Sequence, residues 1–203
     1  MDMPRDDDQD ATLAPLSDEA LLGLYANGDP EAARLLTRRL APRAFAHAVR
    51  MLADRAEAED VAQEALLRLW RIAPQWRQGE ARVTTWLFRV VGNLATDRLR
   101  ARKRRRAEPL DDAPEPASDQ PAVEQVMIEA DRMAALQTAL AALPDRQRQA
   151  VVLRHIEGLA NPDIAAIMEI GVEAVESLTA RGKRALAALL AGRREDLGYE
   201  DAK

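Results

Sequence analysis

The sequence predicts an all-α protein in which two helical domains are joined by a flexible acidic linker. Apolar residues recur at three- and four-residue steps along most of the chain, which is the period of an amphipathic helix. Aromatic residues make up only 3% of the composition and there are nine glycines, whereas Ala, Leu and Arg are abundant, and this balance favours helices over strands. A stretch rich in proline and acidic residues interrupts the apolar pattern, so the 203 residues divide into two small domains.

The chain is expected to have five segments. They are an acidic disordered N-terminus (1–16), a first helical domain (17–106), an acidic Pro-rich linker (107–131), a second helical domain (132–190) and a polar tail (191–203). The net charge of −5 is unevenly distributed. The first domain has 18 basic and 11 acidic side chains, the linker has eight acidic and no basic ones, and residues 132–194 have nine basic and six acidic ones. Two basic blocks separated by an acidic connector indicate two modules that face nucleic acid.

The first domain is predicted to begin with a helix near Ser17, whose hydroxyl and the two acidic residues after it suit a helix N-terminus. The segment 27–30, Asn-Gly-Asp-Pro, is a strong turn signal and places Pro30 in the first turn of a second helix. That helix is expected to reach about Leu52, with a bend at Pro42. Several amphipathic helices with short connections should pack as one bundle.

The third helix, 57–72, has two faces of different chemistry. Its predicted buried stripe consists of Ala58, Val61, Ala62, Ala65, Leu66, Leu69 and Ile72. The opposite face consists of Asp60, Gln63, Glu64, Leu67, Trp70 and Arg71. Because a solvated helix face seldom includes both a Leu and a Trp, this face is predicted to bind a partner.

The next helix, which ends in the basic run 102–106, is predicted to contact DNA. Leu87, Val90, Val91 and Leu94 form its buried stripe, and the opposite stripe contains no acidic residue: Thr85, Arg89, Asn93, Thr96, Arg100 and Lys103. The loop 73–82 before it contains Trp76, Arg77 and Arg82. Two alternatives stay open for Trp76, which either stacks on an unpaired base or folds back onto the bundle.

The second domain has the pattern of a helix-turn-helix. A helix with Pro144 in its first turn and Gly158 just after its end is followed by Asn161-Pro162, which suits an N-cap and a first helical residue. A short helix, a turn at 169–172 and a longer helix complete the motif. A plain helical hairpin is the alternative for this segment.

Composition also excludes several functions. The chain has no Cys, which rules out disulfides and thiolate metal sites, and its two histidines, His47 and His155, are expected to be half-buried or exposed. There is no acid–base pair, phosphate-binding Gly loop or metal cluster, so we expect no catalytic residue, no metal, no cofactor and no small-molecule substrate. The N-terminus does not resemble a signal peptide and no apolar run approaches about 20 residues, so a soluble, cytoplasmic protein without membrane insertion is expected.

Two segments carry a resemblance to a known family. AEDVAQEALLRLWR and TWLFRVVGNLATDRLRARKRR resemble conserved region 2 of bacterial RNA polymerase sigma factors, and LPDRQRQAVVLRHIEGLANPDIAAIMEIGVEAVESLTARGKRAL resembles region 4. The similarity covers roughly residues 17–190, and the compact extracytoplasmic-function (ECF) group fits best. The resemblance implies a sigma factor that binds core RNA polymerase, recognises −10 and −35 promoter elements and helps to open the −10 DNA, under the control of an anti-sigma factor.

The resemblance also assigns residues to partners. The face at Asp60, Gln63, Glu64, Leu67, Trp70 and Arg71 would bind core polymerase. The −10 element, in double-stranded and melted DNA, would contact Trp76, Arg77, Arg82, Trp86, Arg89, Asn93, Arg98 and Arg100. The −35 duplex would contact Ser177, Arg181, Lys183 and Arg184.

Two positions depart from the family pattern. Where sigma factors commonly have Gly in the turn of the helix-turn-helix, this chain has Glu169, so the turn either tolerates a non-Gly residue or shifts toward Gly171. Glu176 stands where the recognition helix often has a basic residue, which prevents a simple transfer of any −35 preference. Two other classes remain: an operator-binding regulator, which leaves the partner face of helix 57–72 unexplained, and a sigma-like decoy, which would have an additional α/β domain.

Overall fold

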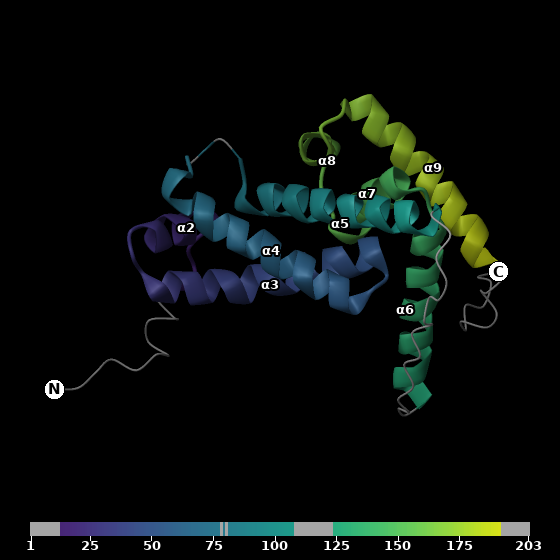
Figure 1. Ribbon diagram of the computed structural model, residues 1–203, viewed down its shortest axis with the longest axis horizontal. Helices are drawn as coiled ribbons and strands as arrows, with labels where there is room; N and C mark the ends of the chain where they lie inside the picture. The colour runs from purple at the N-terminus through teal and green to yellow at the C-terminus, as the bar shows by residue number, and fades with distance from the viewer. Residues whose placement is uncertain (1–12, 78, 80, 108–123, 192–203) are drawn as a thin grey trace. The chain divides into compact units, whose positions relative to one another are not determined.

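A computed structural model describes residues 13–77, 79, 81–107 and 124–191 (Figure 1). All regular elements within these ranges are helical, which confirms the predicted all-α class. In chain order the elements are α2 (Asp18–Ala26), α3 (Pro30–Leu52), α4 (Arg55–Ile72), the 3-10 turn η1 (Ala73–Gln75), α5 (Val83–Ala107), α6 (Glu124–Ala142), α7 (Asp145–Val151), the π-helical turn η2 (Val152–Ile156), α8 (Asn161–Met168) and α9 (Val172–Ala191). Residues 108–123 of the expected linker lie outside the described ranges, whereas residue 107 ends α5 and residues 124–131 belong to α6.

The described residues form two compact units. The first contains the chain up to Val49, together with Asp54–Ala95 and Ala166–Glu169. The second contains Arg50–Ala53, the described residues of Thr96–Ala165, and the described residues from Ile170 onward. Helix α5 therefore contributes its N-terminal half to the first unit and its basic C-terminal half to the second.

Short polar side chains begin the helices of the first unit. The Ser17 hydroxyl accepts a hydrogen bond from the Ala20 N–H at 3.2 Å, and an oxygen of Asp29 accepts from two N–H groups at the start of α3. Asp54 accepts from the Glu57 N–H at 3.0 Å and so caps α4. These side chains satisfy N–H groups that have no partner inside a helix. The predicted helix start at Ser17 and the turn before Pro30 are confirmed, and α3 continues through Pro42 as one helix.

The core of the first unit uses only part of each predicted stripe: on α5, Leu87 and Val91 are buried, whereas Val90 and Leu94 are half-buried. Buried side chains of α4 are Ala58, Val61, Ala62, Ala65 and Leu69, while Leu66 and Ile72 are half-buried. His47 was expected at the surface or half-buried, but it is 0% exposed and its ring centroid lies 5.1 Å from that of Phe88. Thr85, which the sequence placed on the polar stripe of α5, is also buried, because it shares a helix face with Phe88 three residues later, which is 0% exposed.

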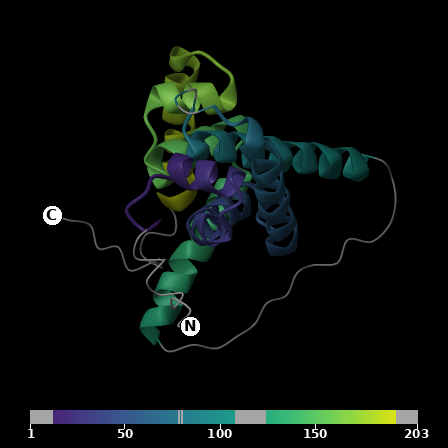
Figure 2. The same cartoon turned by 90° about the vertical axis from the view of Figure 1, so that its left-hand side faces the viewer.

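The second unit is built around close packing of α7 and α9 (Figure 2). Leu140, Leu143, Val151 and Val152 form its core, against which Leu136, Ile156, Ala185 and Leu186 pack. Gly182 is buried in α9, and a Cβ there would lie 2.6 Å from Cγ2 of Val151. Glycine, whose side chain is a single hydrogen atom, therefore fits at this helix crossing, whereas a residue with a Cβ atom would clash.

The helix that the sequence predicts to continue from Pro144 to Gly158 is not uniform. It is α-helical only to Val151 and then widens into η2, where the Glu157 N–H donates to the Val152 oxygen at 3.0 Å. A π turn accommodates one more residue per turn than an α-helix, so the apolar side chains at 151–153 all reach the core.

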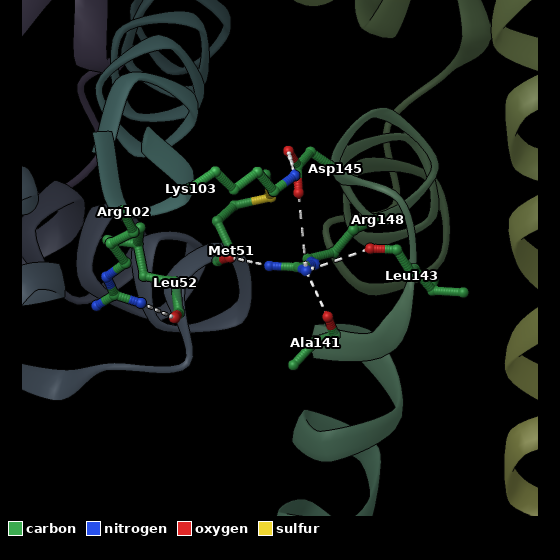
Figure 3. Close-up of polar contacts among 8 residues, drawn as sticks. All are labelled: Met51, Leu52, Arg102, Lys103, Ala141, Leu143, Asp145 and Arg148. Carbon is green, nitrogen blue, oxygen red and sulfur yellow. Dashed lines mark hydrogen bonds and ion pairs between the residues drawn. The ribbon is translucent and has the colours of Figure 1, made fainter. Parts of the chain in front are cut away.

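A buried arginine, Arg148, binds backbone oxygens at the C-terminal ends of two helices within the second unit (Figure 3). Arg148 is 4% exposed, and its guanidinium donates to the backbone oxygens of Met51, Ala141 and Leu143. Asp145 lies 3.9 Å away, and burial lowers the pKa of Arg148 while that carboxylate raises it. These carbonyls lie at helix ends, where they have no partner inside the helix, so Arg148 replaces the missing donors.

Candidate nucleic-acid and partner interface

The predicted partner face of α4 is accessible. Asp60, Gln63 and Arg71 are exposed, Leu67 is 42% exposed, and Glu64 and Trp70 are half-buried. Glu64 forms an ion pair with Arg68 at 2.8 Å, and that bond lowers the pKa of the Glu64 carboxyl. In the free protein the side chain of Leu67 is exposed to water, which is unfavourable for an apolar group. Binding of a partner to this face would therefore be favoured by the burial of that apolar surface.

Trp70 is held in place by its neighbours. Its ring meets Tyr25 of α2 edge to face, with centroids 4.7 Å apart. Both rings line a cavity of about 570 Å³ together with Ala33, Arg34, Thr37 and Arg38 of α3. The spacing of residues along α4 could not indicate this contact, because Tyr25 belongs to another helix. Trp70 therefore marks the edge of the α4 face, and Leu67 marks its centre.

The start of α5 is fixed from α2. An oxygen of Glu19 accepts a hydrogen bond from the backbone N–H of Val83, the first residue of α5, at 3.0 Å. Burial raises the pKa of Glu19, but the bonds from Val83 and Ser17 and the charge of Arg82 together lower it below the ordinary value. The carboxylate thus acts as a cap supplied by a distant helix, and it positions the end of the loop that contains Arg82.

The two tryptophans of the loop and α5 contact each other. Trp76 and Trp86 meet edge to face with centroids 6.3 Å apart, and both are half-buried. This arrangement is the fold-back alternative for Trp76. The indole N–H of Trp76 is buried and has no hydrogen-bond partner among the described residues. Arg77 and Arg82 are exposed on the same loop.

The polar stripe of α5 begins in the first unit with Arg89 and Asn93. Asn93 is exposed, whereas Arg89 is half-buried with its Nη1 3.9 Å from a carboxylate oxygen of Glu169. Both residues belong to the first unit, as does Glu169. An amide can donate and accept at once, so Asn93 is the member of the stripe that suits a base edge.

The stripe continues in the second unit with basic residues. Arg98 is half-buried, and Arg100 is exposed with its Nη1 3.6 Å from a carboxylate oxygen of Asp97. Lys103 forms an ion pair with Asp145 at 2.7 Å, and Arg102 donates to the Leu52 oxygen at 3.1 Å (Figure 3). Two cations of the basic run are therefore engaged inside the chain, and Arg104 and Arg105 are exposed.

The helix-turn-helix consists of α8, the turn at 169–171 and α9. Glu169 adopts a left-handed conformation with φ of +53°, so the turn tolerates a non-Gly residue rather than shifting to Gly171. Helix α8 begins at Asn161 itself, one residue earlier than expected, and the Asn161 amide donates to Glu176 of α9 at 3.3 Å. The predicted motif is thus formed, with Glu176 tied to the preceding helix.

All four residues predicted to meet the −35 duplex are exposed on α9. Arg181 and Arg184 each donate to a backbone oxygen one turn earlier, Arg181 to Ser177 at 3.2 Å. Burial lowers the pKa of His155, and the charges of Lys183 and Arg154 lower it further. Lys183 is therefore part of a basic cluster with Arg154 and His155, which the sequence did not indicate because those two residues belong to another helix.

The comparisons with known proteins agree with these two modules. The family model for sigma-70 region 2 matches residues 36–105, and the model for sigma-70 region 4 matches residues 133–186. The RNA polymerase sigma-H factor of Pseudomonas aeruginosa is 32% identical over 182 residues, covering 86% of this chain and 94% of the relative. The ECF sigma factor SigM of Mycobacterium tuberculosis is 35% identical over 176 residues, covering 86% and 85%. Among solved structures, CnrH in complex with the cytosolic domain of CnrY is 25% identical, covers 86% of this chain and 97% of CnrH, and has a TM-score of 0.63.

Both domains are therefore those of a promoter-recognition subunit of RNA polymerase. The chain belongs to the ECF group of sigma-70-type sigma factors, whose function is to direct core RNA polymerase to promoters. None of the described helices is both long enough and apolar enough to cross a membrane.

Proposed function

We propose that this sigma factor binds core polymerase through the exposed face of α4, opens the −10 DNA with the N-terminal half of α5 and its loop, and reads the −35 duplex with α9. The observation that carries the proposal is the separation of three accessible surfaces of different chemistry. The α4 face has an apolar centre at Leu67, α5 presents Asn93 among cations, and α9 presents polar and basic side chains at the position of a recognition helix. Nucleotide addition would belong to the polymerase, and this chain would contribute promoter recognition and DNA opening.

Binding to core polymerase should depend most on Leu67. Its side chain is 42% exposed and central, so its removal deletes contact area without opening the core. Trp70 also packs on Tyr25, so its replacement affects folding as well as binding. In a pull-down with core polymerase, Leu67→Ala should weaken binding by about tenfold or more, because an interface anchor contributes about 2 kcal/mol. Arg55→Ala, an exposed change on the same helix outside this face, should bind normally.

Opening of the −10 DNA should depend on Asn93. Binding an unstacked base offsets the cost of unpairing it, which is a few kcal/mol. An exposed amide suits this role because it can both donate to and accept from the polar atoms on one edge of the base. Asn93→Ala holoenzyme should bind promoter DNA with nearly normal affinity but show reduced permanganate reactivity at −10. Arg105→Ala, an exposed change in the basic run, should instead lower affinity on every sequence and reduce the salt slope by about one. If Asn93→Ala opens the DNA normally, melting must depend on the loop at Trp76–Arg82.

We further propose that the protein acts in the cytoplasm under an anti-sigma partner. The support is the structural relative CnrH, which was solved with the cytosolic domain of a partner protein. Co-purification of a protein partner that inhibits run-off transcription by the reconstituted holoenzyme would test this control. Uninhibited transcription in the presence of every co-purifying partner would contradict it.

A further inference from the structure

The exposed face of the recognition helix α9 changes charge along its length. Its members are Glu173, Glu176, Ser177, Ala180, Arg181 and Arg184, all exposed, whereas Val175 and Gly182 on the other side are buried. The acidic members lie in the N-terminal half and the basic members in the C-terminal half. In a helix-turn-helix the N-terminal residues of the recognition helix contact base edges, so the acidic half is the half that approaches the bases.

Glu176 has no cation near it along its own helix. Residues 172–180 contain no Lys or Arg, so no helix ion pair neutralises this carboxylate. Close to DNA an uncompensated carboxylate is repelled by the phosphates. The repulsion between such a carboxylate and the DNA phosphates is offset where the carboxylate accepts a hydrogen bond from a donor group on the DNA.

The structure fixes where the Glu176 carboxylate lies. The side-chain amide of Asn161 donates to its Oε1 at 3.3 Å, and both residues belong to the second unit. A carboxylate has about four acceptor sites, so this bond leaves the other oxygen free to accept from DNA. In the major groove cytosine presents its N4 amino group as a donor, and Glu is among the side chains that accept from it.

We propose that Glu176 is a specificity-determining residue that accepts a hydrogen bond from the N4 amino group of a cytosine in the −35 element, with Asn161 as the residue that positions it. The inference rests on the proposed role of α9 in −35 recognition. It assigns base reading to Glu176 in the N-terminal half of α9, and phosphate contacts to Lys183 and Arg184 in the C-terminal half. A purely structural function, in which the Asn161–Glu176 bond only ties α8 to α9, is the competing explanation.

Selection from a DNA duplex library with a randomised −35 region, using holoenzyme reconstituted from the full chain, tests the inference. Wild type should select one position with cytosine on the contacted strand, favoured by about tenfold or more over other bases. Glu176→Gln should change the selected base at that same position to adenine, because an amide pairs with the N6 and N7 atoms of adenine. Glu176→Ala should lose the preference at that position and keep it elsewhere, and Asn161→Ala should weaken it while leaving the base unchanged.

Several outcomes would overturn the inference. One is that Glu176→Gln and Glu176→Ala raise affinity equally on all sequences, which would make Glu176 a repulsive surface charge. Another is that wild type selects adenine at the affected position, which would refute the assignment to cytosine. In both cases the holoenzyme still selects a −35 element, so the proposed function stands. If wild type selects no −35 sequence at all, the proposed role of α9 fails together with this inference.

Discussion

The close approach of α7 and α9 can be tested by replacing Gly182 with alanine. The added Cβ would lie 2.6 Å from Cγ2 of Val151 and 3.1 Å from the backbone oxygen of Gln147, whereas carbon atoms in ordinary contact are about 3.5–4.0 Å apart. Val151 is 1% exposed and β-branched, so it cannot rotate away, and a backbone oxygen cannot move without its helix. The crossing must widen, and overpacking of this kind costs about 1–3 kcal/mol.

One opposing effect reduces this cost. Alanine is a better helix former than glycine by about 1 kcal/mol, so the net loss in free energy of unfolding should be about 1 kcal/mol. The change Ala187→Gly, at an exposed position of α9, measures the helix contribution separately, and it should destabilise by about 1 kcal/mol.

Urea unfolding followed by circular dichroism gives the free energies, and a double mutant identifies the cause. Val151→Ala removes the methyl group that Gly182→Ala would meet, so the double variant should be more stable than the sum of the single losses by about 1 kcal/mol or more. A Gly182→Ala protein that is more stable than wild type would refute the reasoning. Strictly additive losses would show that Val151 is not the obstacle.

Three further predictions concern the backbone turn, a buried charge and a helix cap. Glu169→Gly should raise the free energy of unfolding by about 1 kcal/mol, because glycine adopts a φ of +53° without a Cβ penalty; an unchanged melting temperature would contradict this. Arg148→Ala should lower the free energy of unfolding by about 3 kcal/mol or more, since it leaves buried carbonyl groups without donors, whereas the exposed Arg146→Ala should change it by about 0.5 kcal/mol or less. Glu19 has a pKa below its ordinary 4.5 in the folded chain, so its contribution to stability is present above that pH and is lost as the pH falls through the folded pKa. Glu19→Gln should therefore reduce the dependence of stability on pH in the acid range, and identical acid profiles for the two proteins would exclude the capping role of the carboxylate.

Much of the fold could be predicted because it depends on local signals. The caps at Ser17, Asp29 and Asp54 act within three residues of their own position, and the stripe of α4 follows directly from helical spacing. Such features need no knowledge of what lies nearby in space. For the same reason the exposed face around Leu67 could be identified in advance.

The features that the sequence did not reveal depend on distant neighbours. Arg148 looks like any polar residue of a helix, yet it is buried because carbonyl groups from two other segments meet there. His47 is buried beside Phe88 of α5, and the Glu19 carboxylate binds the start of α5 from α2. Spacing along one helix contains no information about such partners. The tie between Asn161 and Glu176 belongs to the same group, because it joins two helices across a turn.

The two sides of α9 have a consequence for how such proteins diverge. The anchoring side, with Val175 and Gly182, is buried, so substitutions there are costly, whereas Glu176, Ser177 and Arg181 project away from the protein. Exposed substitutions usually alter stability by about 0.5 kcal/mol or less. With α9 reading the −35 element as proposed, a copy of this chain could acquire a different promoter set after gene duplication through a few changes on one side of a single helix. The fold that presents them, and the α4 face proposed to bind polymerase, need not change.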